Sequence, residues 1–191
     1  MAAVDFYFDY ISPYAYLAFK KLQKWRESGL KVRPVPVVFG GLLDAHGQLG
    51  PAEIPAKRAF VIRDCMRIGK RLGVPFQFPA KHPFRPIDAL RLSLEDVSGE
   101  RQWEMIALLY DAVWAKGLDV GDAATLIALL EANGWDGETL LRRTQMPGVK
   151  QALKEQTRLA IERGVFGVPT FVVGEELVWG HDRLADVRAI L

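Results

Sequence analysis

The sequence predicts an α/β fold in which both ends of the chain build a small sheet and helices fill the middle. Residues 4–8 are short, β-branched or aromatic, as in a buried strand, and residues 30–39 form a second candidate strand. The helix predicted between them makes a strand–helix–strand unit, which implies a parallel pair. Near the other end, residues 170–173 and 177–179 flank the turn at residues 174–176 and predict a hairpin.

Residues typical of helix ends locate the first helix within this unit. Ser12 and Pro13 suit a helix entrance, because serine is a good N-cap and proline is accepted in the first turn. Gly29 can end this helix. Pro34 and Pro36 cannot donate backbone hydrogen bonds, so we expect the second strand not to be a central strand with both edges paired.

The middle of the chain shows apolar residues at helical spacing. This periodicity predicts helices over residues 56–72, 100–115, 122–132, 136–144 and 148–163. A last helix is expected to begin near His181 and Asp182. The order β-α-β, helices, α-β-β-α is that of a thioredoxin core with helices inserted in its middle. We predict a core of residues 1–39 and 165–191, an inserted helical domain over residues 40–164, and a ligand site between the two.

A thioredoxin-type fold carries its Cys-x-x-Cys pair directly after the first strand. In this chain the tetrapeptide from Ser12 to Ala15 occupies that place, and both cysteines are absent. Residues 167–171 still have the pattern of the cis-proline loop of that fold. A reactive sulfur would therefore have to arrive with a bound molecule, and glutathione is the favoured candidate.

Composition excludes several classes of function. The 191 residues carry 25 basic and 23 acidic side chains, and a net charge of +2 gives no reason to expect nucleic acid or a membrane as partner. Cys65 is the lone cysteine, which excludes an intramolecular disulfide. The first residues lack a signal-peptide pattern, and no apolar stretch approaches the ~20 residues that span a bilayer. We therefore expect a cytoplasmic protein.

Several blocks of the sequence carry a family resemblance. They are residues 8–16, residues 55–57 with Asp64 and Arg67, and residues 164–171 and 179–184. Together they are similar to the DsbA-like family of kappa-class glutathione transferases and bacterial 2-hydroxychromene-2-carboxylate isomerases, over nearly the whole chain. The resemblance implies a homodimer that binds glutathione without redox chemistry of its own. In the isomerases the thiol assists a cis-trans rearrangement of an aromatic-degradation intermediate, whereas the transferases conjugate it to electrophiles.

Ser12 is the predicted catalytic residue. A thiol with a pKa of about 8.5 is mostly protonated at neutral pH, and the thiolate is the reactive form. A hydroxyl donor and the free amides at a helix N-terminus both favour a nearby anion. Ser12 would thus donate to the glutathione sulfur and not act as a nucleophile. The alternative role is that of a simple N-cap, and the two roles are compatible.

The cofactor-binding residues are expected along one groove. A cis Val168-Pro169 bond would present the backbone of Val168 to the cysteinyl part of glutathione, the alternative being an ordinary trans proline. Asp182, at the start of the last helix, would hold the α-ammonium of the γ-glutamyl end, and the amides of His181 and Asp182 would hold its carboxylate. The alternative for Asp182 is an N-cap.

The glycyl end and the substrate have weaker candidates. Lys57 would pair with the glycyl carboxylate, supplemented by Gln48, although a solvated surface lysine is the usual alternative. Tyr14 would wall an aromatic substrate pocket, and Arg85 in the basic segment 81–85 would meet a substrate carboxylate, unless that segment is a solvated loop. The family often has asparagine at the positions of Gln48 and Arg85, so this chain departs from it there.

Other polar residues are expected to be structural. Asp64 and Arg67 lie three apart on one helix face and predict a local ion pair. Cys65 falls on the apolar stripe of that helix, so we expect it to be buried and inert. The histidines have no metal-ligand spacing, so we expect no zinc site.

Three functions remain open from the sequence. We favour a glutathione-dependent isomerase, which returns glutathione unchanged, over a kappa-like transferase, which releases the conjugate. A non-catalytic thioredoxin-like module that binds a peptide or protein partner is the third. A disulfide oxidoreductase is nearly excluded, because a single thiol cannot shuttle a disulfide within the chain.

Overall fold

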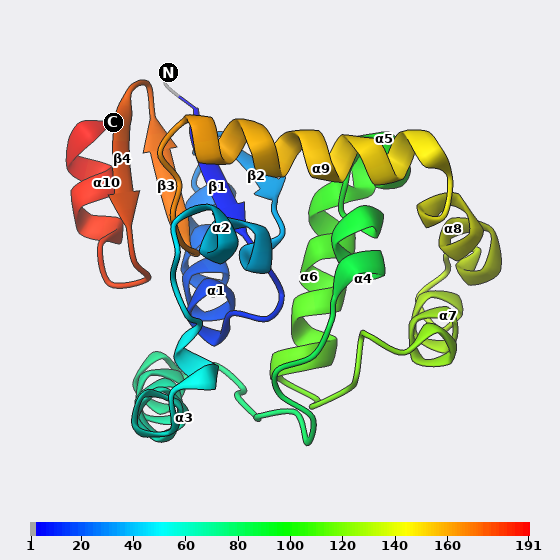
Figure 1. Cartoon of the computed structure of the whole chain (residues 1–191), viewed down its shortest axis with the longest axis horizontal. Coiled ribbons are helices and arrows are strands. Elements are labelled where there is room, and N and C mark those ends of the chain that lie inside the picture. Colours follow the sequence, from blue (N-terminus) through cyan, green and yellow to red (C-terminus); the bar gives the residue numbers. More distant parts are fainter. Residues whose placement is uncertain (1–2) are drawn as a thin grey trace.

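A four-stranded mixed sheet flanked by helices forms the fold, as Figure 1 shows in a computed structural model that describes residues 3–191. The strands are β1 (Val4–Phe8), β2 (Val32–Pro36), β3 (Thr170–Val173) and β4 (Glu176–Trp179), in the order β2-β1-β3-β4. β1 pairs in parallel with β2 and antiparallel with β3, which also pairs antiparallel with β4. The predicted parallel unit, the hairpin and the edge position of β2 are thus confirmed.

Helices form most of the remaining chain. α1 (Pro13–Glu27) connects β1 to β2, and α10 (Leu184–Ile190) is the last helix. Between β2 and β3 lie α2 (Phe39–Ala45), α3 (Pro55–Leu72), α4 (Ile87–Leu92), α5 (Glu95–Ser98), α6 (Gln102–Trp114), α7 (Ala123–Glu131), α8 (Gly137–Thr144) and α9 (Pro147–Glu162), with single 3-10 turns at Pro51–Glu53 and Gly99–Arg101. Among the described residues, no helix has both the length and the apolar character needed to cross a membrane.

Two boundary predictions are wrong. The second strand ends at Pro36, because Phe39 already begins α2, a helix that its two glycines made hard to predict. The last helix begins at Leu184 with Arg183 as its N-cap, so Asp182 neither starts nor caps it. A turn precedes the helix instead, in which the Arg183 N–H donates to the Gly180 carbonyl at 3.3 Å. The short helices α4 and α5 were also missed.

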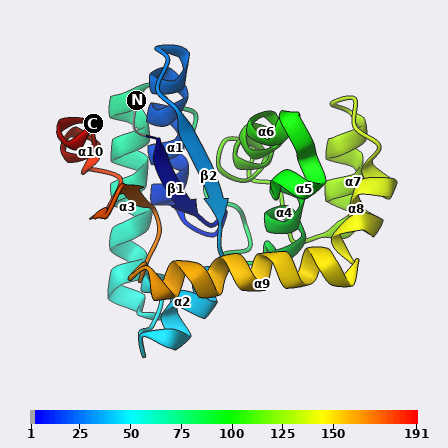
Figure 2. The ribbon, with the colours of Figure 1, turned by 90° about the horizontal axis from the view of Figure 1, so that it is seen from above.

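The sheet separates two apolar cores. Phe6 and Phe8 of β1 belong to the larger core, together with α1, α6 and α10, whereas Tyr7 belongs to the smaller core with α2 and α9. α9 contacts α2 and β2 as well as α4 and α8, so that one helix joins the sheet to the helical part of the chain (Figure 2).

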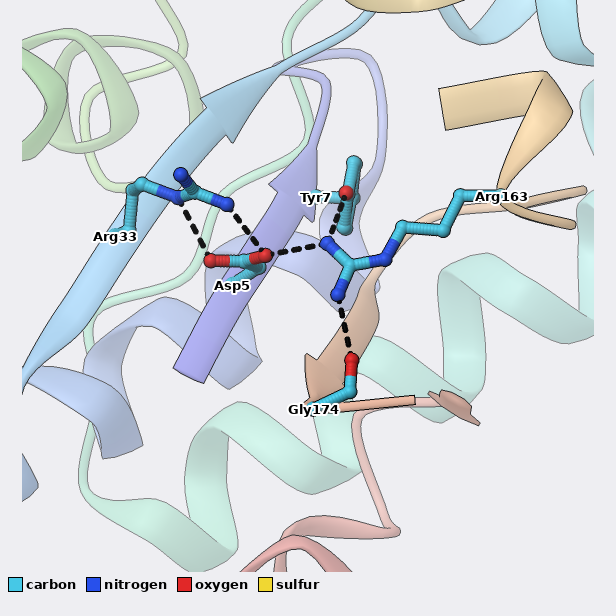
Figure 3. A network of polar contacts seen from close by, with 5 residues as sticks. All are labelled: Asp5, Tyr7, Arg33, Arg163 and Gly174. Carbon is cyan, nitrogen blue, oxygen red and sulfur yellow. Dashed lines mark hydrogen bonds and ion pairs between the residues drawn. The ribbon is translucent and has the colours of Figure 1, made fainter. Parts of the chain in front are cut away.

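A buried carboxylate in β1 ties several segments together (Figure 3). Asp5 accepts two hydrogen bonds from Arg33 of β2, both of 2.7 Å. Arg163, just after α9, contacts the same carboxylate at 2.6 Å and the Tyr7 hydroxyl at 3.1 Å, and also donates to the Gly174 carbonyl at 2.7 Å. Because a buried charge is tolerated when it is paired and hydrogen-bonded, this network stabilises the sheet and the β3–β4 turn.

A second buried carboxylate follows β1 and has only amide partners. Asp9 is 2% exposed and accepts hydrogen bonds from the N–H groups of Ile11 at 3.0 Å and Phe39 at 2.9 Å. These bonds join the segment before α1 to the first residue of α2. Burial raises the pKa of Asp9 to about 6, although the backbone hydrogen bonds oppose this shift.

We predict that Asp9 makes the protein less stable as the pH rises. The pKa is about 6 in the folded protein and 3.8 without burial, so the folded state binds more protons between these values and stability falls through this window. A difference of about two units corresponds to about 3 kcal/mol at ~1.4 kcal/mol per unit. Urea unfolding of the wild type and Asp9→Asn near pH 4 and pH 7 measures it. A stability difference between the two proteins that is the same at both pH values would contradict the prediction.

Candidate functional site

The candidate site lies at the end of the sheet where several segments meet. Pairing of Phe8 with Pro36 and of Tyr7 with Thr170 brings the ends of β1 and β2 to the start of β3. Pairing of Thr170 with Trp179 adds the end of β4. Residues 9–12 follow β1, residues 166–169 precede β3 and residues 180–183 follow β4. These segments are therefore neighbours although they are far apart in sequence.

Ser12 links the start of α1 to the proline loop. Its hydroxyl oxygen accepts a hydrogen bond from the Ala15 N–H at 3.2 Å, which makes Ser12 the N-cap of α1. The same hydroxyl donates to the Val168 carbonyl at 3.3 Å, and the Val168-Pro169 bond is cis. The capping role is therefore present, and it coexists with a contact to the residue expected to bind glutathione. At 8% exposed, Ser12 lies just beneath the surface.

A pocket of about 370 Å³ opens beside this contact. Its volume falls within the range of about 300–1,000 Å³ that is usual for small-molecule sites. The structure brings together five of the predicted site residues here, and adds Trp179, Gly180 and Arg183. The lining residues are Tyr14, Val168, Pro169, Trp179, Gly180, His181, Asp182 and Arg183.

Aromatic rings form the walls of the pocket. The Tyr14 ring stacks on the His181 ring with centroids 4.5 Å apart, and its hydroxyl donates to Asp64 of α3 at 2.9 Å. Trp179, 53% exposed, packs on Phe166 with centroids 5.2 Å apart. Asp64 also pairs with Arg67 at 3.2 Å, as predicted, but its contact with Tyr14 gives it an additional role next to the pocket.

The ionisable groups at the pocket include a neutral histidine and an exposed carboxylate. Burial lowers the pKa of His181 from its usual 6.5, which keeps the ring neutral at neutral pH. Lys21 donates to the His181 carbonyl at 3.3 Å, and burial lowers the pKa of this lysine as well. The exposed Asp182 carboxylate makes no ion pair within residues 3–191. It is therefore free to receive a cationic group.

Unpaired backbone donors at the pocket test whether a peptide such as glutathione would fit. Within the described part of the chain, the N–H groups of Val168, His181 and Asp182 donate to no protein acceptor. Free amide donors bind carboxylates and extended peptides. Together with the free Asp182 carboxylate, which suits an ammonium group, they match the polar groups of a γ-glutamyl tripeptide, so these residues fit glutathione.

The remaining predicted residues lie outside the pocket walls. Gln48 follows α2, Lys57 is in the first turn of α3, and Arg85 precedes α4, and all are exposed. No hydrogen bond or ion pair among residues 3–191 joins their side chains to the pocket lining. Their roles therefore stay predictions. Within the same residues, no group of three or more histidine, cysteine or acidic side chains is placed to hold a metal ion.

Trp179 and Arg183 were missed in the sequence analysis. Both belong to the block of residues 179–184 that carried the family resemblance, but a tryptophan at a strand end gives no local signal of a pocket wall. Any side chain at Gly167 would meet the Trp179 ring, because a Cβ there would lie 2.9 Å from its Nε1. Glycine at this position thus lets the indole lie against the proline loop.

Comparisons with known proteins agree with this geometry. A family model for the DSBA-like thioredoxin domain matches residues 3–191. A 2-hydroxychromene-2-carboxylate isomerase of Pseudomonas putida is 34% identical over 186 residues, covering 95% of this chain and 90% of its own. Human glutathione S-transferase kappa 1 is 24% identical over 200 residues, covering 95% of this chain and 87% of its own.

A solved structure supports the same relationship. Selenomethionine 2-hydroxychromene-2-carboxylate isomerase superposes with a TM-score of 0.89 at 30% identity, covering 98% of this chain and 93% of that chain. The chain belongs to the DSBA-like thioredoxin domain family, in the group that contains 2-hydroxychromene-2-carboxylate isomerases and kappa-class glutathione transferases.

Proposed function

We propose that this enzyme is a glutathione-dependent cis-trans isomerase of the 2-hydroxychromene-2-carboxylate type, which acts on an aromatic-degradation intermediate. Isomerases of that name are 31% to 34% identical to the chain over nearly its full length. The observation that carries the proposal is the Ser12 hydroxyl, which lies at the start of α1 against Val168, beside a pocket with free amide donors. A cytoplasmic location and a homodimer belong to the same proposal.

The residues of the pocket would hold the tripeptide by its polar ends. The backbone of Val168 would pair with the cysteinyl part, and the amides of His181 and Asp182 would bind the γ-glutamyl carboxylate. The Asp182 carboxylate would bind the α-ammonium. Lys57, with Gln48, would reach the glycyl carboxylate from α3 and the loop before it.

Ser12 has the properties needed to favour an anion. Bound glutathione would supply a thiolate that adds reversibly to a conjugated double bond, so that rotation can occur before the thiol leaves. In the structure, the Ser12 proton is directed to a neutral carbonyl over 3.3 Å, which is a long hydrogen bond. If this proton turns toward an anion, the long bond to the carbonyl is replaced by a stronger, charge-assisted bond, and the N-terminus of α1 stabilises the anion further. Together they can lower a thiol pKa by about one to two units.

Substrate binding would use the aromatic walls of the same pocket. Tyr14 is fixed by its stack with His181 and its hydrogen bond to Asp64, so it offers a rigid face to an aromatic ring. Arg85 would meet a carboxylate of the substrate. Kappa-class relatives at 24% to 25% identity support the alternative of a transferase with the same site.

Replacement of Ser12 separates its capping role from its donor role. Ser12→Ala removes both and should raise the pKa of bound glutathione by about one to two units and cost about 1 kcal/mol of stability. Ser12→Asp keeps a cap but has no proton to donate, so it should stay folded and show the same or a larger rise in pKa. Ser12→Thr keeps both groups and serves as control. Thiolate absorbance measured against pH gives the pKa, and equal values in all four proteins would contradict the role.

Glutathione consumption tests the function itself. With 2-hydroxychromene-2-carboxylate as substrate, an isomerase should need only catalytic glutathione and return all of it, whereas a transferase consumes one thiol for each product. Glutathione alone should raise the melting temperature, because a ligand that binds the folded state stabilises it. Asp182→Asn should weaken this shift, with Glu175→Gln in the distant β3–β4 turn as a matched control. No shift at millimolar glutathione would favour the non-catalytic binding module.

A further inference from the structure

Two adjacent carbonyl groups just before Ser12 accept hydrogen bonds from side-chain rings of the helical part of the chain. The Trp114 Nε1 of α6 donates to the Tyr10 carbonyl at 2.8 Å. The His82 Nε2, in the loop between α3 and α4, lies 3.0 Å from the Ile11 carbonyl. Because a carbonyl oxygen can only accept, His82 carries its proton on Nε2 in this arrangement.

His82 is held in place from several sides. Its ring packs between Phe78, Phe84 and Trp114, with centroids 5.6, 6.0 and 5.6 Å away. Arg58 of α3 donates to its backbone carbonyl at 3.0 Å. The alternative that residues 81–85 are a solvated loop is therefore wrong for His82, because aromatic packing buries part of its ring. Burial lowers its pKa, so the ring is a neutral donor at neutral pH.

The peptide group of Ile11 is fixed on its other side by Asp9. The Ile11 N–H donates to the Asp9 carboxylate at 3.0 Å, and the Ser12 N–H donates to the Asp9 carbonyl at 3.1 Å. Both polar backbone groups of Ile11 are thus bound by side chains. The direction of a serine hydroxyl follows from the backbone that carries it, because its rotamers are few.

We infer that His82 is a positioning residue for Ser12. Its hydrogen bond to the Ile11 carbonyl fixes the backbone conformation that sets the direction of the Ser12 hydroxyl and of the first amides of α1. Through the same bond, this direction depends on the position of the loop before α4. The effect on a bound thiol rests on the proposed function, but the effect on the backbone does not. An apolar residue at position 82 leaves a partly buried carbonyl without its donor directly before the catalytic hydroxyl.

The test compares variants that differ in the donor and in packing. His82→Leu removes the N–H donor with little loss of apolar volume, and His82→Gln keeps an N–H at nearly the same reach. His82→Asn places its donor too close to the backbone to reach Ile11, and it replaces His82→Leu in the comparison if the leucine variant does not fold. Phe78→Leu disturbs the same aromatic packing without touching the donor, and is the matched control.

Two readouts separate positioning from stability. In the protein without glutathione, amide hydrogen exchange over residues 10–16 should be about five- to tenfold faster in His82→Leu, since one hydrogen bond is lost locally. With glutathione, the thiol pKa should rise, and kcat should fall about tenfold with KM changed less than about twofold. His82→Gln should restore most of the wild-type exchange rate and most of the wild-type kcat. Phe78→Leu should lower only the melting temperature.

Other outcomes have distinct meanings. Wild-type exchange and kcat in His82→Leu or His82→Asn would overturn the inference. So would equal effects of Phe78→Leu and His82→Leu, or a His82→Gln variant that behaves as His82→Leu does. If the wild type itself shows no bound thiolate, the proposed function fails, while the exchange measurement still decides whether His82 positions the backbone.

Discussion

The antiparallel pairing of β1 with β3 is the constraint on which the rest of the site depends. With Tyr7 opposite Thr170, the chain leaving β1 must run beside the chain entering β3. The contact between Ser12 and Val168 is a consequence, as is the position of the pocket between them and the end of β4. The parallel partner β2 ends at the same place, which allows Asp9 to reach the first amide of α2. A one-residue shift between β1 and β3 would reverse which side chains face each core and separate these groups.

Two buried carboxylates, one in β1 and one just after it, show that the free-energy cost of burying a charge depends on its partners. Asp5 is paired with two arginines and joins segments that have no part in the pocket. Asp9 has amide donors and no cation, so its ionised form is stabilised less than it would be in water and its pKa rises. The protein keeps this unfavourable group where the backbone before Ser12 must be fixed. We interpret it as stability given up for a defined turn at the site.

The sequence predicted the elements that local chemistry determines. Ser12-Pro13 identified the start of α1, the spacing of apolar residues predicted α3, α6, α7, α8 and α9, and the prolines of β2 placed it at an edge. Prediction from the sequence failed where the formation of an element or the role of a residue depends on contacts between residues far apart in the chain. α2 contains Gly40 and Gly41, and its start is held by distant side chains. Asp9 accepts from the amide of Phe39, its first residue, and Thr157 accepts from the amide of its N-cap residue Val38, 119 positions away. His82 had no local pattern, since its role depends on a carbonyl 71 positions earlier.

Under the proposed function, the missing cysteines explain why a bound ligand would have to supply the sulfur. Cys65 cannot replace them, because it is fully buried on α3 and burial raises the pKa of its thiol well above the usual value. Ser12 occupies the position at the helix start where an anion is favoured, but its hydroxyl does not ionise near neutral pH. In the proposed mechanism it would therefore act as a donor to an anion that is bound beside it. The identity of the reaction would then depend less on Ser12 than on the walls of the pocket, since Tyr14 and Trp179 would decide how long an adduct is held and whether it reverts or leaves.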